Sequence, residues 1–477
     1  MKLELINFGP IDNCSLDLSK NFTIIVGQNN IGKSYAISFL YTLIKTLNRF
    51  RQINLYFYQD SYRNEKSTST KEIINKIHEE LGDGKSEKDI SHHIIKIIKG
   101  RIENGILFAL EQALIGTFSD LNLLPNRLTN KPLLIRLNSE KYQLAIGTTN
   151  GKLSIENFHI NHKFHTKSIK QNRTPKSSDN KTIIYHSSTN SYQLETNIDI
   201  NTSRIEQEFI DQVCGQIYDV HYLPASRSGL YQSLSAFGQI VAELAKNRSL
   251  LRQKIELPGI AEPLSDYFLK LSDIKIVQND KNDHLYHEIA DEIERTILRG
   301  KVTIEPKTKK ILFRPDKMDI DLDLSSTSSM VSEISPIATY IRHILPRSTS
   351  PKRIHPALRR KGVTQMVFIE EPEAHLHTEI QTKLISLLAK LSTLTPTKII
   401  ITSHSNYIFN KCSNLLIEKT LIPEQFSAVL FSRNEKGSTT EELKVTSLGI
   451  SDKNFVDVGE QLYEEKLRLI TEIRRNA

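Results

Sequence analysis

The sequence has 477 residues, and 63 lysines and arginines against 55 aspartates and glutamates give it a formal net charge of +8. With 38% hydrophobic and 25% charged residues, it has the composition of a globular protein long enough for two or three domains. No apolar run approaches the roughly 20 residues of a membrane span, and the N-terminus does not resemble a signal peptide. The three cysteines, Cys14, Cys214 and Cys412, form no C-x-x-C pair. These features argue against a membrane protein, a disulfide framework and a cysteine zinc site, and predict a cytoplasmic protein.

The first informative segment is a glycine-rich loop between a strand-like run at residues 22–26 and an apolar helical run at residues 35–47. Its eight residues are Gly27, Gln28, Asn29, Asn30, Ile31, Gly32, Lys33 and Ser34. The spacing G-x-x-x-x-G-K-S lets the backbone N–H groups surround a phosphate chain, while the lysine reaches the outer phosphate oxygens and the serine hydroxyl binds Mg²⁺. This loop therefore predicts a nucleotide site.

A long insertion follows the loop. Residues 70–115 have helical spacing with a break at residues 82–84, residues 131–200 have the pattern of short strands and turns, and residues 238–300 return to helix. No heptad pattern is sustained, so we expect a compact arm instead of a long coiled coil.

A serine-rich run precedes an apolar helical segment in the second half of the chain. It comprises Ser325, Ser326, Thr327, Ser328 and Ser329. Hydroxyl groups at a helix start can donate to a phosphate, with help from the helix dipole, but a serine there can also be a simple N-cap. Upstream, Asp319, Asp321 and Asp323 alternate, and we interpret them as a polar strand edge.

Two acids lie at the end of an apolar strand at residues 366–369. Glu370 is expected to act on Mg²⁺ through a water, and Glu371 to orient the attacking water as a base. About thirty residues later, a second apolar strand at residues 398–401 ends near His404, which is placed to reach a γ-phosphate. The acids and the histidine predict hydrolysis of the bound nucleotide.

Together these motifs resemble the ABC-type ATPase head of the OLD (overcoming lysogenization defect) proteins, which are relatives of the SMC and RecF ATPases. G-x-N-x-x-G-K-S, E-E-P-E-A-H-L-H and I-I-T-S-H-S carry the resemblance, with an N-F-G-x-I turn at residues 7–11. It covers the first 50 residues and residues 320–450. It implies an α/β fold: an ABC-type P-loop ATPase head, with a mixed sheet flanked by helices and an inserted α+β arm.

The resemblance also implies residue roles and an assembly. Lys33 and Ser34 become Walker A, Glu370 and Glu371 Walker B, His375 the D-loop region and His404 the switch histidine. The serine run takes the place of the signature, although the chain lacks L-S-G-G-Q. Ser226 and Arg227, or alternatively Gln232, occupy the Q-loop position, where they would sense phosphate or couple the site to the arm. Since the family holds a nucleotide between one protomer's P-loop and the other's signature, we expect a homodimer or higher homo-oligomer with ATP and Mg²⁺.

The same resemblance divides the chain into five parts. These are 1–50, the head with Walker A; 51–215, the arm; 216–320, a return segment and helical subdomain; 321–450, the rest of the head; and 451–477, a C-terminal helix that packs on the head or docks a partner.

Two stretches concentrate the basic residues, at residues 163–181 and 347–361. Either can follow a nucleic-acid backbone, and either can be a solvated loop. His159, His162 and His165 are regularly spaced, but no acid or cysteine joins them, so a metal site is disfavoured.

No nuclease motif follows His404, whereas many OLD proteins carry a Toprim nuclease there. The chain therefore resembles the ATPase subunits of two-component anti-phage systems such as Septu, also found with retrons, and PARIS. The resemblance implies an ATPase that controls a separate HNH or Toprim-type effector. The alternative is a DNA repair or recombination ATPase of the RecF/SMC kind, and a transporter head is a weaker third.

Overall fold

The computed structural model describes residues 2–57, 68–81, 87–149, 151–168, 176–178, 180–186, 191–233, 259–274, 283–306, 308–348, 364–451 and 465–468. Its centre is an 11-stranded sheet in the order β11-β15-β16-β3-β17-β18-β2-β1-β5-β6-β7. The strands are β1 (Lys2–Phe8), β2 (Ile11–Asp17), β3 (Phe22–Val26), β5 (Leu134–Asn138), β6 (Tyr142–Thr149), β7 (Lys152–Ile160), β11 (Ile217–Leu223), β15 (Thr364–Glu370), β16 (Thr397–Ser403), β17 (Phe426–Asn434) and β18 (Gly437–Glu442).

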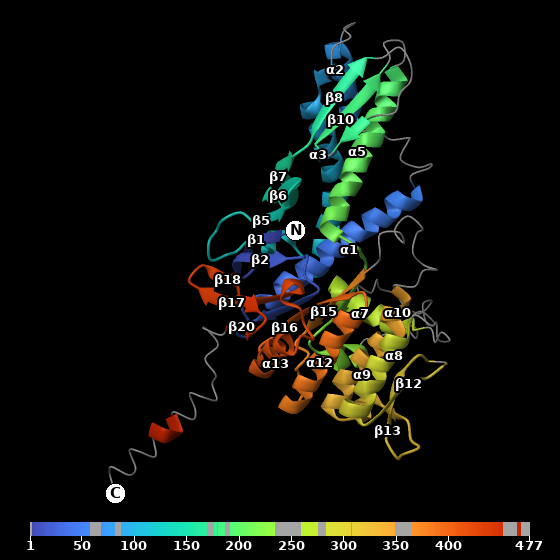
Figure 1. The fold of residues 1–477 in the computed structure, drawn as a ribbon, viewed down its shortest axis with the longest axis vertical. Helices are drawn as coiled ribbons and strands as arrows, with labels where there is room; N and C mark the ends of the chain where they lie inside the picture. The colour runs from blue at the N-terminus through green and yellow to red at the C-terminus, as the bar shows by residue number, and fades with distance from the viewer. Residues whose placement is uncertain are drawn as a thin grey trace, which may run out of the picture.

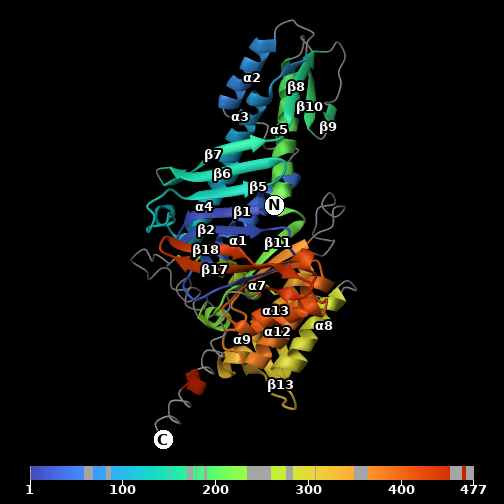
Figure 2. The ribbon, with the colours of Figure 1, turned by 60° about the vertical axis from the view of Figure 1, so that its left-hand side comes forward.

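One half of this sheet is parallel and the other half is mostly antiparallel. β11, β15, β16, β3 and β17 pair in parallel, whereas β2, β1, β5, β6 and β7 pair antiparallel in turn. The strands β5 to β7, within the range that the sequence assigns to the arm, thus continue the head sheet (Figure 2). Parallel strands bury both faces, and every residue of β3 is buried.

Helices cover both faces of the parallel half. Along β3, Ile25 packs into the cluster that contains α1 (Lys33–Phe57), whereas Ile24 and Val26 pack into the opposite cluster. That second cluster is built by α7 (Glu262–Ser272), α8 (His284–Ile293), α9 (Ser329–Thr339), α12 (Thr378–Leu394) and α13 (Asn406–Ile417). The alternation of side chains along a strand produces this three-layer arrangement.

The arm rises from the α1 side of the sheet (Figure 1). Its helices are α2 (Thr68–Leu81), α3 (Ser91–Ile102), the π-helical turn at Glu103–Leu107, α4 (Phe108–Phe118) and α5 (Ser191–Cys214). Its sheet has the order β4-β8-β10-β9, formed by β4 (Lys88–Asp89), β8 (Lys163–Ser168), β9 (Lys176–Ser178) and β10 (Lys181–His186). The strand pattern expected over residues 131–200 gives way to α5 at Ser191, and the break expected at residues 82–84 lies outside the described residues.

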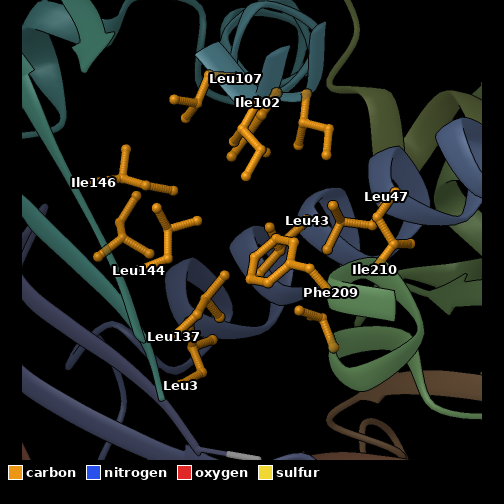
Figure 3. Packing of buried hydrophobic residues seen from close by; sticks show 14 of the residues in the cluster. Leu3, Leu43, Leu47, Ile102, Leu107, Leu137, Leu144, Ile146, Phe209 and Ile210 are labelled. Atoms are coloured by element: carbon orange, nitrogen blue, oxygen red, sulfur yellow. The ribbon is translucent and has the colours of Figure 1, made fainter. Parts of the chain in front are cut away.

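Arm and head share one apolar core. Figure 3 shows side chains from β1, β5, β6, α1, the arm helices and α5 pointing toward one another. The labelled residues are Leu3, Leu43, Leu47, Ile102, Leu107, Leu137, Leu144, Ile146, Phe209 and Ile210, all of them buried. Because this core is continuous, the base of the arm is fixed to the helix that carries the glycine-rich loop.

The remaining elements are small. A three-stranded sheet comprises β12 (Gly300–Ile304), β13 (Ile311–Pro315) and β14 (Leu322–Asp323), and a hairpin comprises β19 (Val445–Thr446) and β20 (Gly449–Ile450). Short helical segments are Leu121–Leu123, Glu294–Leu298, Leu324–Ser326, Tyr340–Ile344, α10 (Leu345–Ser348) and Pro423–Gln425. Apart from residues 451 and 465–468, the expected C-terminal helix lies outside the described residues. The predicted fold class, an α/β head with a mixed sheet flanked by helices and an inserted α+β arm, is confirmed.

Candidate functional site

The carboxyl ends of neighbouring parallel strands bring the predicted site residues to one edge of the sheet. In the register, Val26 pairs with Ser403 across β3 and β16, and Glu370 pairs with Thr402 across β15 and β16. The glycine-rich loop, His404 and Glu371 each follow one of these strand ends. Ligands bind at this edge in open α/β sheets, so the topology gathers segments that are far apart in the sequence.

Two glycines shape the loop. Gly27 has φ +148°, and a Cβ there would lie 2.6 Å from the Phe431 carbonyl oxygen; Gly32 has φ +91°, and a Cβ there would lie 2.8 Å from Cγ of Pro10. Any side chain at these positions would be strained and would also meet its neighbours. The turn between β1 and β2, which contains Pro10, therefore supports the loop directly.

Lys33 starts α1 and lies inside the loop. Its ammonium group donates to the carbonyl oxygens of Gly27 at 2.8 Å and Gln28 at 2.6 Å, and the residue is only 5% exposed. Burial lowers the pKa of Lys33, while the nearby carboxylates of Glu371 and Glu373 raise it. A desolvated cation at the start of a helix has the chemistry that a triphosphate requires. Gln28, Asn29, Asn30 and Ser34 are exposed at this loop, whereas Ile31 is buried.

Glu370 lies at the end of β15 next to the serine that follows Lys33. Burial raises the pKa of this carboxyl group, and hydrogen bonds from Ser34, Tyr222 and the Ala225 N–H partly offset that increase. Its Oε1 atom is buried and has no hydrogen-bond partner among the described residues. Mg²⁺ prefers oxygen ligands, so a carboxylate with an unused oxygen beside a hydroxyl fits this ion, which would polarise the phosphate oxygens when bound.

Glu371 and His404 face each other from adjacent strand ends. Glu371 has the positive φ of +40°, and its N–H donates to the Thr402 carbonyl oxygen at 2.9 Å. His404 Nδ1 lies 3.8 Å from Glu371 Oε1, and the two side chains are 40% and 32% exposed. The hydrogen bond to Thr402 holds the unusual backbone conformation of Glu371, and the Glu371 carboxylate remains accessible.

Glu373 is a residue that the sequence analysis did not assign. It is 4% exposed, and its Oε1 accepts hydrogen bonds from the Ser403 hydroxyl and the His404 N–H, both at 2.8 Å. The same atom lies 3.3 Å from His404 Nδ1, and Oε2 is buried without a partner in the described structure. Glu373 therefore fixes the position of His404. In the sequence, the only sign of this role is that Glu373 is the third acid of the E-E-P-E motif. Two residues later, His375 has a positive φ of +60°.

The serine-rich run lies at the start of α9. Ser325, Ser326 and Ser328 are exposed, and Thr327 is half-buried. Ser328 is the N-cap of α9 and accepts from the Val331 N–H at 3.4 Å. The capping interpretation is thus present in the structure, and the hydroxyls remain accessible for the signature role that the resemblance implies. Upstream, Asp321 accepts two 2.8 Å hydrogen bonds from Arg314. Of the three alternating aspartates, only Asp323 lies in a strand, β14, so the expected strand edge is shorter than predicted.

The residues expected at the Q-loop position lie just after β11, and for Arg227 the structure argues against phosphate sensing. Arg227 is completely buried and donates to the Glu370 carbonyl oxygen at 2.9 Å. A side chain with no exposed surface cannot contact a nucleotide in solution, so Arg227 instead supports the segment that carries Glu370 and Glu371. Ser226 is exposed and Gln232 is half-buried.

The predicted basic stretches are only partly described. Lys163, Lys167, Lys176 and Lys181 lie on the arm sheet, whereas Lys170, Arg173 and residues 349–363 lie outside the described residues. His162 Nε2 and the Thr182 hydroxyl lie 2.8 Å apart, and His165 is 3.1 Å from Glu87. Within the described ranges, no group of three or more metal-binding side chains occurs, and no helix has the length and apolar character needed to cross a bilayer.

A family model described as an AAA ATPase domain (AAA_15) matches residues 1–409. No curated protein matches in sequence. Similar solved structures include an SmcHead bound to the C-winged helix domain of ScpA, with 12% identity, TM-score 0.37 and coverage of 93% of this chain and 97% of that chain. An SMC head domain from Thermotoga maritima has 11% identity, TM-score 0.35 and coverages of 93% and 98%. A Smc head domain with an extended coiled coil, bound to the C-terminal domain of ScpA derived from Pyrococcus furiosus, has 12% identity, TM-score 0.36 and coverages of 99% and 98%.

Proposed function

Because this chain belongs to the AAA_15 family of AAA ATPase domains, we propose that it binds ATP with Mg²⁺ at the sheet edge described above and hydrolyses it there. One observation carries the proposal: the ends of three adjacent parallel strands bring together residues from three separate parts of the sequence, namely Lys33, Ser34, Glu370, Glu371 and His404. Lys33 and the loop N–H groups bind the phosphates. Glu371 accepts a proton from the attacking water, and His404 lies beside it.

We further propose that two heads dimerise around the nucleotide. The exposed residues Ser325, Ser326 and Ser328 precede a helix N-terminus, where donors and the helix dipole favour a phosphate. The Ser325 hydroxyl donates to Asp323 Oδ1 at 2.8 Å and would exchange this partner for the phosphate. In this arrangement, the serine run of one protomer completes the site formed by the P-loop of the other. ATP then links two copies of the chain, and its hydrolysis releases them.

ATP-dependent dimerisation tests this proposal. With ATP and Mg²⁺, light scattering should report a mass about twofold that of the protomer, since a ligand that binds the dimer more tightly than the protomer shifts the equilibrium toward the dimer. Ser326→Trp, at an exposed position, should block dimerisation and lower the apparent ATP affinity without abolishing binding, because the loop and Lys33 of the same protomer still bind the phosphates. Asn157→Trp, which introduces the same indole side chain at an exposed position of β7, should dimerise like the parent. A wild-type chain that stays monomeric with saturating ATP would exclude the shared site.

The OLD-type motifs support a finer proposal, in which the ATP-bound dimer controls a separate nuclease-like effector in anti-phage defence. The described residues contain no cluster of acids and histidines that would hold a nuclease metal ion. Asp321, the central residue of the D-x-D-like series, is engaged by Arg314. An effector function would then be supplied by a partner protein.

Direct action on DNA is the second candidate, and a pocket in the arm favours it. The pocket has a volume of about 410 Å³ and lies between α5 and the arm sheet. Among the described residues, Arg204 donates to the hydroxyls of Ser177 at 3.0 Å and Thr182 at 3.4 Å, and no ion pair of Arg204 occurs. The same pocket is lined by Glu208, whose carboxylate pairs with Lys141 at 2.6 Å. Because the hydrogen bonds of Arg204 go to hydroxyl groups, its guanidinium group keeps donors for a phosphate group.

One pair of measurements separates the two candidates. If the arm binds nucleic acid, Arg204→Ala should weaken a mobility shift several-fold and flatten its dependence on salt, because one phosphate contact is lost. Arg136→Ala, which removes a cation paired with Glu4 on the head sheet, is the matched control. No shift even at low salt would exclude direct action on DNA. Co-purification of the chain with the nuclease-like product of a neighbouring gene would instead support the defence function.

A further inference from the structure

Arg227 connects the Walker B strand to the helix that follows the serine run. Its guanidinium group donates to the carbonyl oxygens of Pro224 at 3.0 Å, Glu370 at 2.9 Å and Glu371 at 3.5 Å. The side chain has no exposed surface, and the Tyr267 hydroxyl donates to the Arg227 carbonyl oxygen at 3.1 Å. One buried cation thus holds the backbone of both Walker B acids.

The carboxylate of Glu333 pairs with this buried arginine. It lies on α9, is 2% exposed, and its Oε2 is 3.3 Å from Arg227 Nε and accepts from the Arg227 N–H at 3.1 Å. Its Oε1 accepts from the Ser228 hydroxyl at 2.6 Å and the Ser228 N–H at 3.3 Å. Arg227 Nε also donates to the Glu333 carbonyl oxygen at 3.2 Å. Because these hydrogen bonds and the ion pair join Glu333 to Arg227 and Ser228, we expect α9 and residues 227–228 to move together.

A buried ion pair is a poor source of stability. Desolvation of two charges offsets most of their attraction, so such a pair is better explained by the geometry that it imposes than by the free energy of unfolding that it adds. Here the Arg227–Glu333 pair fixes the distance between α9 and Glu371. Because Glu371 has an unusual positive φ, a shift of its backbone would change the direction of its side chain.

We propose that Arg227 and Glu333 are positioning residues that couple the two nucleotides of the dimer. The inference rests on the proposed function, because it requires the partner's ATP to contact the serine run. When that ATP binds, α9 shifts, Glu333 carries Arg227 with it, and Arg227 moves the carbonyl groups of Glu370 and Glu371. Each ATP therefore sets the geometry of the general base that serves the other ATP, and hydrolysis depends cooperatively on ATP concentration.

Two variants test this coupling. Glu333→Gln keeps the size and one acceptor but removes the charge, and Arg227→Lys keeps the charge but shortens the reach toward the Walker B carbonyls. Both are expected to reduce the Hill coefficient of ATP hydrolysis from above one to about one and to lower kcat about tenfold, the range of a typical coupling between sites. ATP affinity at low occupancy should stay the same, because neither residue contacts the P-loop. Ser228→Ala, which removes one hydrogen bond at Glu333 and none at Walker B, should keep the parental cooperativity.

The outcomes distinguish the coupling from the proposed function. If the wild type does not bind ATP or dimerise, the proposed function fails; if it does both and either folded variant retains the parental Hill coefficient and kcat, the coupling is overturned. Should both variants fail to fold, amide exchange in the wild type decides. ATP must then change the protection of the Arg227 and Ser228 N–H groups, which donate to Glu333, together with that of Glu371. Unchanged protection at these amides would also overturn the coupling.

Discussion

Replacing Lys33 by alanine is expected to lower ATP affinity about 100-fold or more, because it removes the charge-assisted hydrogen bonds to the outer phosphates. The ammonium group is already buried and oriented by two loop carbonyls, so binding requires little reorganisation. Isothermal titration with ATP and Mg²⁺ measures the effect. Lys20→Ala is the matched control, since Lys20 is a half-buried cation that donates to the Glu424 carbonyl oxygen outside the candidate site.

Unchanged ATP binding by the Lys33 variant would contradict this role of the ammonium group. A folded Lys33→Ala protein that bound ATP within about threefold of the wild type would show that the ammonium group makes no essential phosphate contact. The loop would then be a structural turn between β3 and α1, and the nucleotide site would have to lie elsewhere.

Replacing Glu371 by glutamine is expected to lower kcat by about 100-fold to 10,000-fold while ATP still binds, because an amide cannot accept a proton from the attacking water. Since hydrolysis would no longer separate the heads, an ATP-bound dimer should accumulate. Light scattering and single-turnover hydrolysis together measure both effects. Glutamine is nearly isosteric, and the backbone hydrogen bonds of Glu371 to Thr402 are retained, so loss of folding is not expected.

The control for Glu371→Gln is Glu379→Gln. Glu379 is an exposed acid in the first turn of α12, where it pairs with Lys383 at 2.7 Å. Its replacement removes one negative charge outside the sheet edge and should leave hydrolysis unchanged. Hydrolysis at the parental rate by Glu371→Gln would refute the role of general base, and the neighbouring acids Glu370 and Glu373 would become the candidates for it.

Local motifs were sufficient to identify the glycine-rich half of the candidate site. The loop at residues 27–34 can be recognised from local sequence alone, because its glycines, its lysine and the following helix occur within about a dozen residues. Apolar runs also predict the two strands at residues 366–369 and 398–401, which the structure extends to Thr364–Glu370 and Thr397–Ser403. The order β15-β16-β3 comes from the structure.

Long-range contacts explain what sequence reasoning missed. Arg227 and Glu333 are separated by 106 positions, and Arg227 and Glu370 by 143. A single sequence gives no sign that a lone arginine and a glutamate in a helix will be buried together. Arg227 was therefore interpreted as a phosphate sensor or a link to the arm, and Glu333 was not singled out. The motif gives Glu373 no role, because only the structure places Ser403 and His404 against it.

The antiparallel half of the sheet was not predicted in detail for the same reason. The pairing of β1 with β5 joins residues 2–6 to residues 134–138, and a short amphipathic strand does not identify its partner. Helix α5 was likewise missed at residues 191–200, where a polar sequence follows several strands and its buried face includes Leu194 and Ile198. Packing against α1 and α3 provides the apolar surroundings that propensity alone does not reveal.

The position of β3 in the sheet has a consequence for how the protein is made. This strand ends before residue 27, yet its two neighbours are β16 and β17, at residues 397–403 and 426–434. During synthesis on the ribosome, the proposed ATP site cannot assemble until nearly the whole polypeptide has emerged. The arm and the N-terminal strands have most of their partners earlier, so they are free to fold first. A nascent chain therefore lacks the assembled sheet edge until translation is almost complete.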